Sequence, residues 1–313
     1  MADLKERPAP KFRFSGHQTF VFRHGWLEKG VRAVEANNGA LAEDNALVAL
    51  GVGKNMVESI RHWCLVTQMV EEIATEKRNN GRILRPTKIA RKLLLEDGWD
   101  PYLEDDASLW LIHWLLVTNP QIVTTWQIAF ADYQRSDFSK HELAEFVTSI
   151  AERRGATVNT GSLGRDVDCF VRTYAPSRGT GKTTLPEESF DCPLQSLDLI
   201  QATADSDLYR FAVGSKPTLP TAVFGFALVE FFGRTRGGSN TLSVQECLYG
   251  RGSPGQAFKL DENSLMFHLE ELAELTKGHL VLDETAGLKQ VYRKEKVDAI
   301  SLLARYYGGE ARQ

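Results

Sequence analysis

One segment of this 313-residue chain is apolar on nearly every side. From Ala107 it reads ASLWLIHWLLV, with Trp110 and Trp114 one helical turn apart. A helix without a polar face cannot lie at a protein surface, so other elements must cover it all round. The sequence therefore predicts a buried helical spine, and we expect its histidine, His113, to be hydrogen-bonded within the core.

The segment 41–92 has the pattern of a helix-turn-helix. Apolar residues within 43–50 suit a short core-facing helix, and Gly51-Val52-Gly53 supplies the conformational freedom of a tight turn. The next helix begins near Lys54 and carries apolar residues at helical spacing. Its open face is predicted to hold polar and charged side chains: Lys54, Asn55, Glu58, Arg61 and His62.

A basic hairpin follows this pair of helices. Asn79-Asn80-Gly81 is a typical hairpin turn, and residues 77–92 hold seven basic side chains and no acid, namely Lys77, Arg78, Arg82, Arg85, Lys88, Arg91 and Lys92. Such side chains bind DNA phosphates and release counterions, and the second helix of a helix-turn-helix lies in the major groove. We therefore predict DNA contacts by Lys54, Asn55, Arg61, His62, Lys77, Arg78, Arg82 and Arg85. The alternative is a protein-contact module with a solvated basic edge.

Two later stretches have a similar order of elements, although their sequences differ. Residues 141–154 and 162–174 look like two helices around a break, and Arg165, Asp166 and Arg172 are predicted to lie outward, with the two arginines as further DNA contacts. Residues 261–293 read as a helix followed by two strands. The predicted fold class is mainly α with small β-hairpins (α+β), with recurring winged-helix or helix-turn-helix units around the buried spine.

The length of the chain predicts about two domains. We expect a flexible basic tail over residues 1–13 and an N-terminal winged-helix domain over 14–130. A C-terminal domain over 131–313 would then contain the further helix-turn-helix and winged-helix-like units.

The charge of the chain is small overall but strongly segregated. A net charge of −4 excludes a globally basic nucleic-acid coat protein, yet residues 1–40 hold seven basic against four acidic side chains. Residues 96–106 then contribute six acids and no base. No apolar run approaches the roughly 18 residues of a membrane span. The first residues are polar and basic and lack the apolar core of a secretory signal, so we expect none. The scattered cysteines indicate reduced thiols, so we expect a cytoplasmic protein.

The acidic run contains candidate metal ligands. Hydrolysis of a phosphodiester usually needs carboxylates that hold a divalent ion, or a histidine that activates water. Asp97, Asp100 and Glu104 are therefore candidate ligands for magnesium, the cofactor expected if the protein is an enzyme. Asp97, Asp100, Glu104, Asp105 and His17 are the candidate catalytic residues. The alternative is turn chemistry at Asp97 and Asp100, with Asp105 or Asp106 capping the helix that follows.

His17 belongs to the cluster FSGHQTF, with Arg23 and His24 close by. Such a cluster could bind phosphate or position a water molecule. A histidine that is hydrogen-bonded to backbone in a packed loop is the commoner arrangement. No established nuclease signature is intact in the sequence.

Several long motifs resemble those of a known family. They are FSGHQTFVFRHGWLEKG, LGVGKNMVESIRHWC, EDGWDPYLEDDASLWLIHWLLVTN, SLGRDVDCFVRTYAPS, RGSPGQAFKLDE and DETAGLKQVYR, and they extend over residues 14–293. The chain resembles a bacterial family of formerly unknown function whose members occur with DNA phosphorothioation defence systems. These systems replace a backbone oxygen of DNA by sulfur. In their single-strand version, the family member is the nicking component.

The resemblance implies a DNA-acting protein that makes single-strand breaks at short sites, opening DNA for sulfur insertion. It implies as partners double-stranded DNA, a cysteine desulfurase, an ATPase and a sulfurtransferase-like protein. No catalytic set transfers to positions of this sequence. The residues leave open a non-enzymatic adaptor that recruits the modification machinery, or a transcriptional regulator. Because site-specific DNA binders usually have two-fold symmetry, we expect a homodimer.

Overall fold

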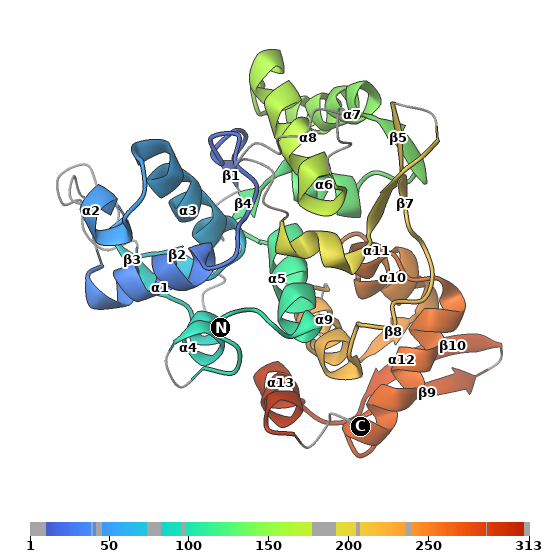
Figure 1. Cartoon of the computed structure of the whole chain (residues 1–313). Coiled ribbons are helices and arrows are strands. Elements are labelled where there is room, and N and C mark those ends of the chain that lie inside the picture. Colours follow the sequence, from blue (N-terminus) through green and yellow to red (C-terminus); the bar gives the residue numbers. More distant parts are fainter. Residues whose placement is uncertain are drawn as a thin grey trace, which may run out of the picture.

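The apolar helix predicted from the sequence lies at the centre of the fold (Figure 1). Helix α5 (Asp106–Val117) is buried at every residue from Ala107 to Val117. His113 is hydrogen-bonded within the core, because its ring nitrogens lie 2.8 Å from the Tyr174 hydroxyl and 2.8 Å from the Ala257 carbonyl. The predictions of a buried spine and of a core histidine are both confirmed.

The computed structural model describes residues 11–38, 40–41, 46–73, 83–95, 98–176, 192–204, 207–235, 239–285 and 287–309. Their buried apolar side chains form one continuous hydrophobic core that extends from Val21 to Leu303. None of the helices in these ranges combines the length and the apolar character that a membrane span requires.

The N-terminal part of the chain is helical with one small hairpin. Its elements are α1 (Trp26–Ala36), α2 (Ala46–Leu50), α3 (Lys54–Val66), β2 (Val70–Glu72), β3 (Leu84–Pro86) and α4 (Lys88–Leu94). Strands β2 and β3 are antiparallel. Strand β1 (Lys11–Phe12) pairs in parallel with β4 (Ile122–Val123), and Phe12 packs against the core. The prediction of a flexible tail is therefore wrong for residues 11 and 12, because backbone pairing and a partly buried aromatic ring hold them.

In the middle part, two α-helices follow the first strand of a small sheet in the sequence and precede its other two strands. Its elements are α6 (Thr125–Ala131), β5 (Asp137–Ser139), α7 (Lys140–Arg153), α8 (Thr160–Tyr174), the 3₁₀ helix η2 (Pro193–Leu197), β6 (Ile200–Ala202) and β7 (Leu208–Phe211). The strand order is β5-β7-β6, so the first strand pairs with the last.

The C-terminal part has the same strand order. It consists of α9 (Thr221–Arg234), β8 (Thr241–Ser243), α10 (Val244–Tyr249), α11 (Pro254–Phe258), α12 (Glu262–Leu275), β9 (Leu280–Thr285), β10 (Leu288–Arg293) and α13 (Ala299–Tyr307). The sheet order is β8-β10-β9. The structure is thus a mixture of helices and small sheets, as the predicted α+β class requires at this coarse level.

Equivalent capping boxes begin the helix that follows the first strand of each three-stranded sheet. Ser139 caps α7 and Ser243 caps α10, and in both cases the glutamate three residues later, Glu142 or Glu246, bonds back to the cap residue. A serine followed at this spacing by glutamate is a local helix start signal. The two short sequences therefore fix the same strand-to-helix junction in two parts of the chain.

Candidate functional site: a basic seam and an acidic pocket

The segment 15–20, which lies within the FSGHQTF motif, is held between α3 and α8. On the α3 side, the Gln18 side-chain amide donates to the Glu58 carboxylate at 2.6 Å, and the Trp63 indole N–H donates to the Phe20 carbonyl at 3.2 Å. We call this segment the seam. It joins a helix of the N-terminal part to a helix of the middle part.

The α8 side of the seam uses more hydrogen bonds. The Ser15 N–H donates to Asp166 Oδ1 at 2.7 Å, and the Ser15 hydroxyl donates to the Ser162 carbonyl at 2.7 Å. Near the other end, the Arg172 guanidinium donates to the Thr19 carbonyl at 2.6 Å. The seam therefore follows one face of α8 over more than two turns.

His17 lies in the interior of this junction, with no exposed surface. Its Nδ1 accepts the Thr19 N–H at 3.1 Å, so its Nε2 carries the proton that is donated to Asp166 Oδ1 at 2.9 Å. The second oxygen of Asp166 accepts the Thr125 hydroxyl. The prediction that Asp166 lies outward on its helix is therefore wrong, because these donors hold its side chain in the interior. A residue that attacks DNA or activates water must reach the surface, so this arrangement gives His17 a positioning role and corrects its prediction as a catalytic residue.

The prediction that His62 lies on the open face of α3 is wrong. Its side chain is buried beside His17, with 5.7 Å between ring centroids, and it packs against Gly16. Neither ring nitrogen has a hydrogen-bond partner among the described residues. Burial lowers the pKa of His62 well below its ordinary value, and the nearby His17 and Arg13 lower it further. The physical reason for the error is the seam, which covers the side of α3 that local periodicity leaves to solvent.

The basic residues predicted on α3 and α8 fall into two rows beside the seam. Lys54 and Arg61 share a face of α3 with Glu58, at spacings of four and three residues, and Gln18 bonds to that Glu58. Arg165 and Arg172 lie seven residues apart on one face of α8. Lys54, Asn55 and Arg165 are exposed, whereas Arg61 and Arg172 are half-buried. The structure therefore brings together residues that the sequence placed in separate units.

Only part of the predicted basic hairpin lies within the described residues. Lys77, Arg78 and Arg82 lie outside the described residues. Arg85 is exposed and pairs with Glu71 at 2.7 Å, Arg91 pairs with Glu35, and the Lys92 ammonium lies 5.5 Å from the centre of the Trp99 ring. Part of the positive charge of this region is therefore engaged within the protein.

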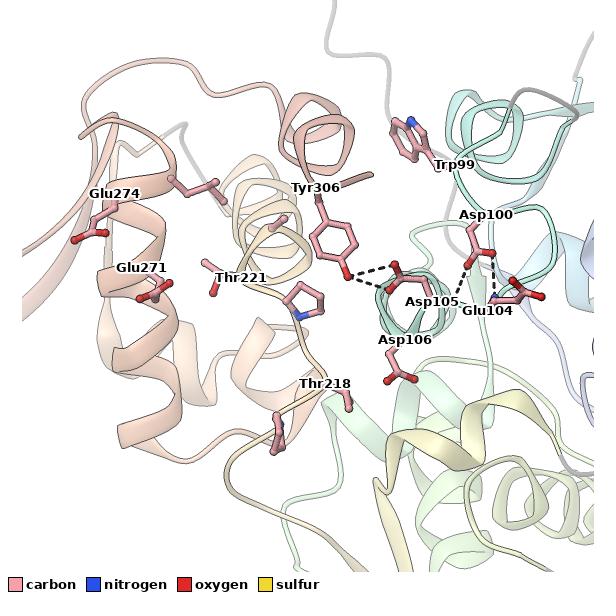
Figure 2. A pocket seen from close by; sticks show the side chains of 14 residues that line it. Trp99, Asp100, Glu104, Asp105, Asp106, Thr218, Thr221, Glu271, Glu274 and Tyr306 are labelled. Atoms are coloured by element: carbon pink, nitrogen blue, oxygen red, sulfur yellow. Dashed lines mark hydrogen bonds between the residues drawn. The ribbon is translucent and has the colours of Figure 1, made fainter. Parts of the chain in front are cut away.

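A second feature is an acidic pocket of about 990 Å³, lined by α5, α9, α12 and α13 (Figure 2). Six carboxylates line it: Asp100, Glu104, Asp105, Asp106, Glu271 and Glu274. Glu271 and Glu274 come from α12, about 170 residues beyond the predicted acidic run, and local sequence gave no signal for them. Asp97, the remaining predicted ligand, lies outside the described residues.

Two of the predicted metal ligands have structural partners. Asp100 accepts the backbone N–H groups of Glu104 and Asp105, each at 3.0 Å, and the Ser108 hydroxyl at 2.6 Å. Asp105 caps α5 through the Ala107 N–H at 2.9 Å and accepts the Tyr306 hydroxyl at 3.0 Å. These contacts match the turn-and-cap alternative. The carboxylates of Glu104 and Asp106 form no hydrogen bond with the described part of the chain.

No three His, Cys, Asp or Glu side chains within the described ranges lie close enough together to hold one metal ion. The hard carboxylate oxygens of the pocket are still of the type that magnesium prefers. Magnesium often binds only one or two protein carboxylates, and Glu104 and Asp106 are the lining carboxylates of α5 and of the turn before it that have no hydrogen-bond partner in the described part of the chain.

The chain belongs to the protein family of unknown function DUF4007, whose model matches residues 14–307. It is similar to a crystal structure of SspB, with 31% identity and a TM-score of 0.85 over 97% of this chain and 91% of that one. A crystal structure of magnesium ion-bound SspB is similar to the same degree, with 30% identity and a TM-score of 0.85 over 97% of this chain and 90% of that one. No curated protein sequence matches the chain. The structure is therefore SspB-like, in agreement with the resemblance to the phosphorothioation family.

Proposed function

We propose that this protein is the DNA-nicking component of a phosphorothioation system. The observation that carries the proposal is the similarity to SspB over 97% of the chain, at 30% identity. In this role the protein binds duplex DNA and hydrolyses one strand at a short site, which opens the DNA for sulfur insertion by the partner enzymes.

DNA binding is assigned to the face that carries the seam. The middle part has the winged-helix order of a strand, two helices and two strands, β5-α7-α8-β6-β7, so α8 would be its DNA-reading helix. Helix α3 likewise follows a short helix and precedes the hairpin of β2 and β3, and it would have the same role. The contacts in this proposal are Lys54, Asn55, Arg61, Arg165 and Arg172. Nearby acids are engaged, since Gln18 bonds to Glu58 and Lys140 pairs with Asp168 at 2.6 Å. Arg61, Arg165 and Arg172 form no ion pair with a carboxylate of the described residues, so their positive charge is available to phosphates.

Strand cleavage is assigned to the acidic pocket. Glu104 and Asp106 would hold a magnesium ion there, with Asp100 and Asp105 fixing the turn that carries them. Magnesium bound in this way polarises a phosphate and stabilises its developing negative charge. The similarity to a magnesium-bound SspB crystal structure supports this choice of metal.

One observation favours a second candidate function. Asp100 and Asp105, two of the candidate catalytic residues, serve as turn and cap residues, which suits a DNA-binding adaptor that recruits the modification machinery and does not cut DNA itself.

A plasmid assay separates the two functions. Supercoiled plasmid incubated with the protein and magnesium should become open circular. Glu104→Gln combined with Asp106→Asn should abolish nicking and leave DNA affinity unchanged. Glu145→Gln combined with Glu152→Gln, two surface changes on α7, is the matched control and should nick normally.

The outcomes are distinct. If the wild-type protein binds DNA but nicks none of several plasmids with magnesium or manganese, the adaptor function replaces the nicking function. Full activity of the Glu104 and Asp106 double variant would instead move the chemistry away from the acidic pocket.

A further inference from the structure

We infer that the seam is itself a DNA-contacting element, in which the Thr19 hydroxyl binds a backbone phosphate between the arginines of α3 and α8. This inference rests on the proposed DNA binding and adds a contact to it. It assigns a role to the central residues of FSGHQTF, which the predicted contact surface left out.

The backbone of the seam has an unusual conformation. Ser15, Gln18 and Thr19 all have positive φ, at 57°, 50° and 67°. Such values are rare for residues other than glycine, and a β-branched residue such as threonine is a genuine outlier there. A strained residue persists only where its surroundings impose the conformation, and such residues gather at functional sites. Glycine would fit position 19 with less strain, so a threonine at this position costs stability.

Hydrogen bonds within the protein impose this conformation on Thr19. The Thr19 N–H donates to His17 and its carbonyl accepts from Arg172, so both backbone groups are used within the protein. His17 is in turn fixed by the buried Asp166. The Thr19 side chain is exposed and forms no hydrogen bond with the described residues. The network thus presents this hydroxyl at the surface, where an external group can bind it.

The charges around Thr19 identify that group. Arg172 bonds to Thr19 directly, and Arg61 lies on the face of α3 that Gln18 contacts. The Arg23 guanidinium packs 5.4 Å from the centre of the Phe20 ring at the end of the seam. The Nε atoms of Arg23 and Arg61 are buried and have no hydrogen-bond partner among the described residues.

The acids of this region have partners within the protein. Glu58 accepts Gln18, Asp166 is buried with His17, and Asp168 pairs with Lys140. A hydroxyl beside Arg172, on the side of α3 that carries Arg61, suits a DNA phosphate, since threonine and arginine side chains are both usual donors to phosphate oxygens.

The test uses two substitutions of one residue. Thr19→Gly removes the hydroxyl and relieves the backbone, so its melting temperature should rise while its affinity for a fluorescent 30-base-pair duplex falls about three- to tenfold. Thr19→Val keeps the branched shape of the side chain. Its affinity for the duplex should fall by the same factor, but its melting temperature should not rise. Because a hydroxyl releases no counterions, the salt dependence of binding should stay unchanged in both variants.

Lys277→Gly is the matched control. Lys277 is exposed and also has a positive φ, at 53°, but it follows α12 in the C-terminal part. Its substitution should raise the melting temperature and leave DNA affinity unchanged.

The results separate this inference from the proposed function. If the wild-type protein binds the duplex and both Thr19 variants bind equally well, the seam contact is refuted and the proposed DNA binding stands. The same refutation follows if Thr19→Val binds like the wild type, because the hydroxyl would then make no contact. If the wild-type protein binds no duplex, the proposed function itself fails.

Discussion

His17 Nε2 lies 2.9 Å from Asp166 Oδ1, and this buried bond joins residues 149 positions apart. Asp166 also accepts Ser15 and Thr125, so one carboxylate holds the seam, α6 and α8 together. Asp166→Ala would leave these donors without a partner and should lower the free energy of unfolding by about 3 kcal/mol or more. Chemical denaturation measures this loss. Asp168→Ala, an exposed change two residues away, should cost less than about 1 kcal/mol, and an equal loss in both variants would contradict the bridging role.

Gly16 is required by the buried ring of His62. A Cβ atom at this position would lie 2.4 Å from His62 Nδ1. Gly16→Ala should therefore overpack the junction and lower stability by about 1–3 kcal/mol. At Gly164 on α8 nothing lies within 4 Å of such an atom, so Gly164→Ala should raise stability by about 0.5–1 kcal/mol through helix propensity. Thermal melts of the two variants compare the predicted loss of stability with the predicted gain.

Lys259 is a buried base with no acidic partner among the described residues. Its ammonium lies 3.3 Å from the Phe130 carbonyl and 4.4 Å from the centre of the Phe211 ring, and burial lowers the pKa of Lys259 from 10.5 to about 7. The unfolded chain holds this proton more tightly, so stability should rise as the pH rises from 7 to 10.5. Lys259→Met should stabilise the protein by about 2 kcal/mol at pH 7 and remove this rise. Unfolding experiments measure the change in stability of Lys259→Met, and Lys216→Met, the same substitution at a half-buried lysine, is the comparison.

His113 makes the protein sensitive to acid. Burial lowers the pKa of His113 from 6.5 to about 3. Between these values the unfolded chain binds a proton that the folded state does not, so stability should fall as the pH drops from 6.5, by about 2 kcal/mol at pH 5. Urea unfolding at pH 7 and pH 5 measures the loss. His113→Gln should reduce the difference between the two pH values, whereas His141→Gln, at an exposed histidine, should not.

The rows of basic residues on α3 and α8 predict a defined salt dependence of DNA binding. Each phosphate contact contributes about 0.9 to the slope of log affinity against log salt concentration. Arg61→Gln combined with Arg165→Gln should weaken binding and reduce the slope by about 2. Lys294→Gln combined with Lys296→Gln, beyond the last strand, should leave the slope unchanged. An unaltered slope in the first variant would place DNA on another face.

Much of the local structure could be predicted from the sequence. The continuous apolar run of α5 requires burial whatever surrounds it, and the serine–glutamate spacing at Ser139 and Ser243 fixes two helix starts. The cap at Asp105 was among the alternatives that the sequence offered, since aspartate before an apolar helix accepts the first free amides. These features depend on residues close together in the chain, where periodicity and hydrogen-bonding chemistry act directly.

The tertiary structure decided which residues meet. Local periodicity places His62 outward on α3, but the seam covers that side of the helix. Glu271 joins Asp106 in one pocket only because α9, which contacts both helices, brings α12 to the pocket that the start of α5 also lines. The sequence by itself determined the buried spine, the helix starts and the family. Contacts such as His17 with Asp166 were decided by packing between distant elements, because burial and charge pairing depend on neighbours that no local pattern specifies.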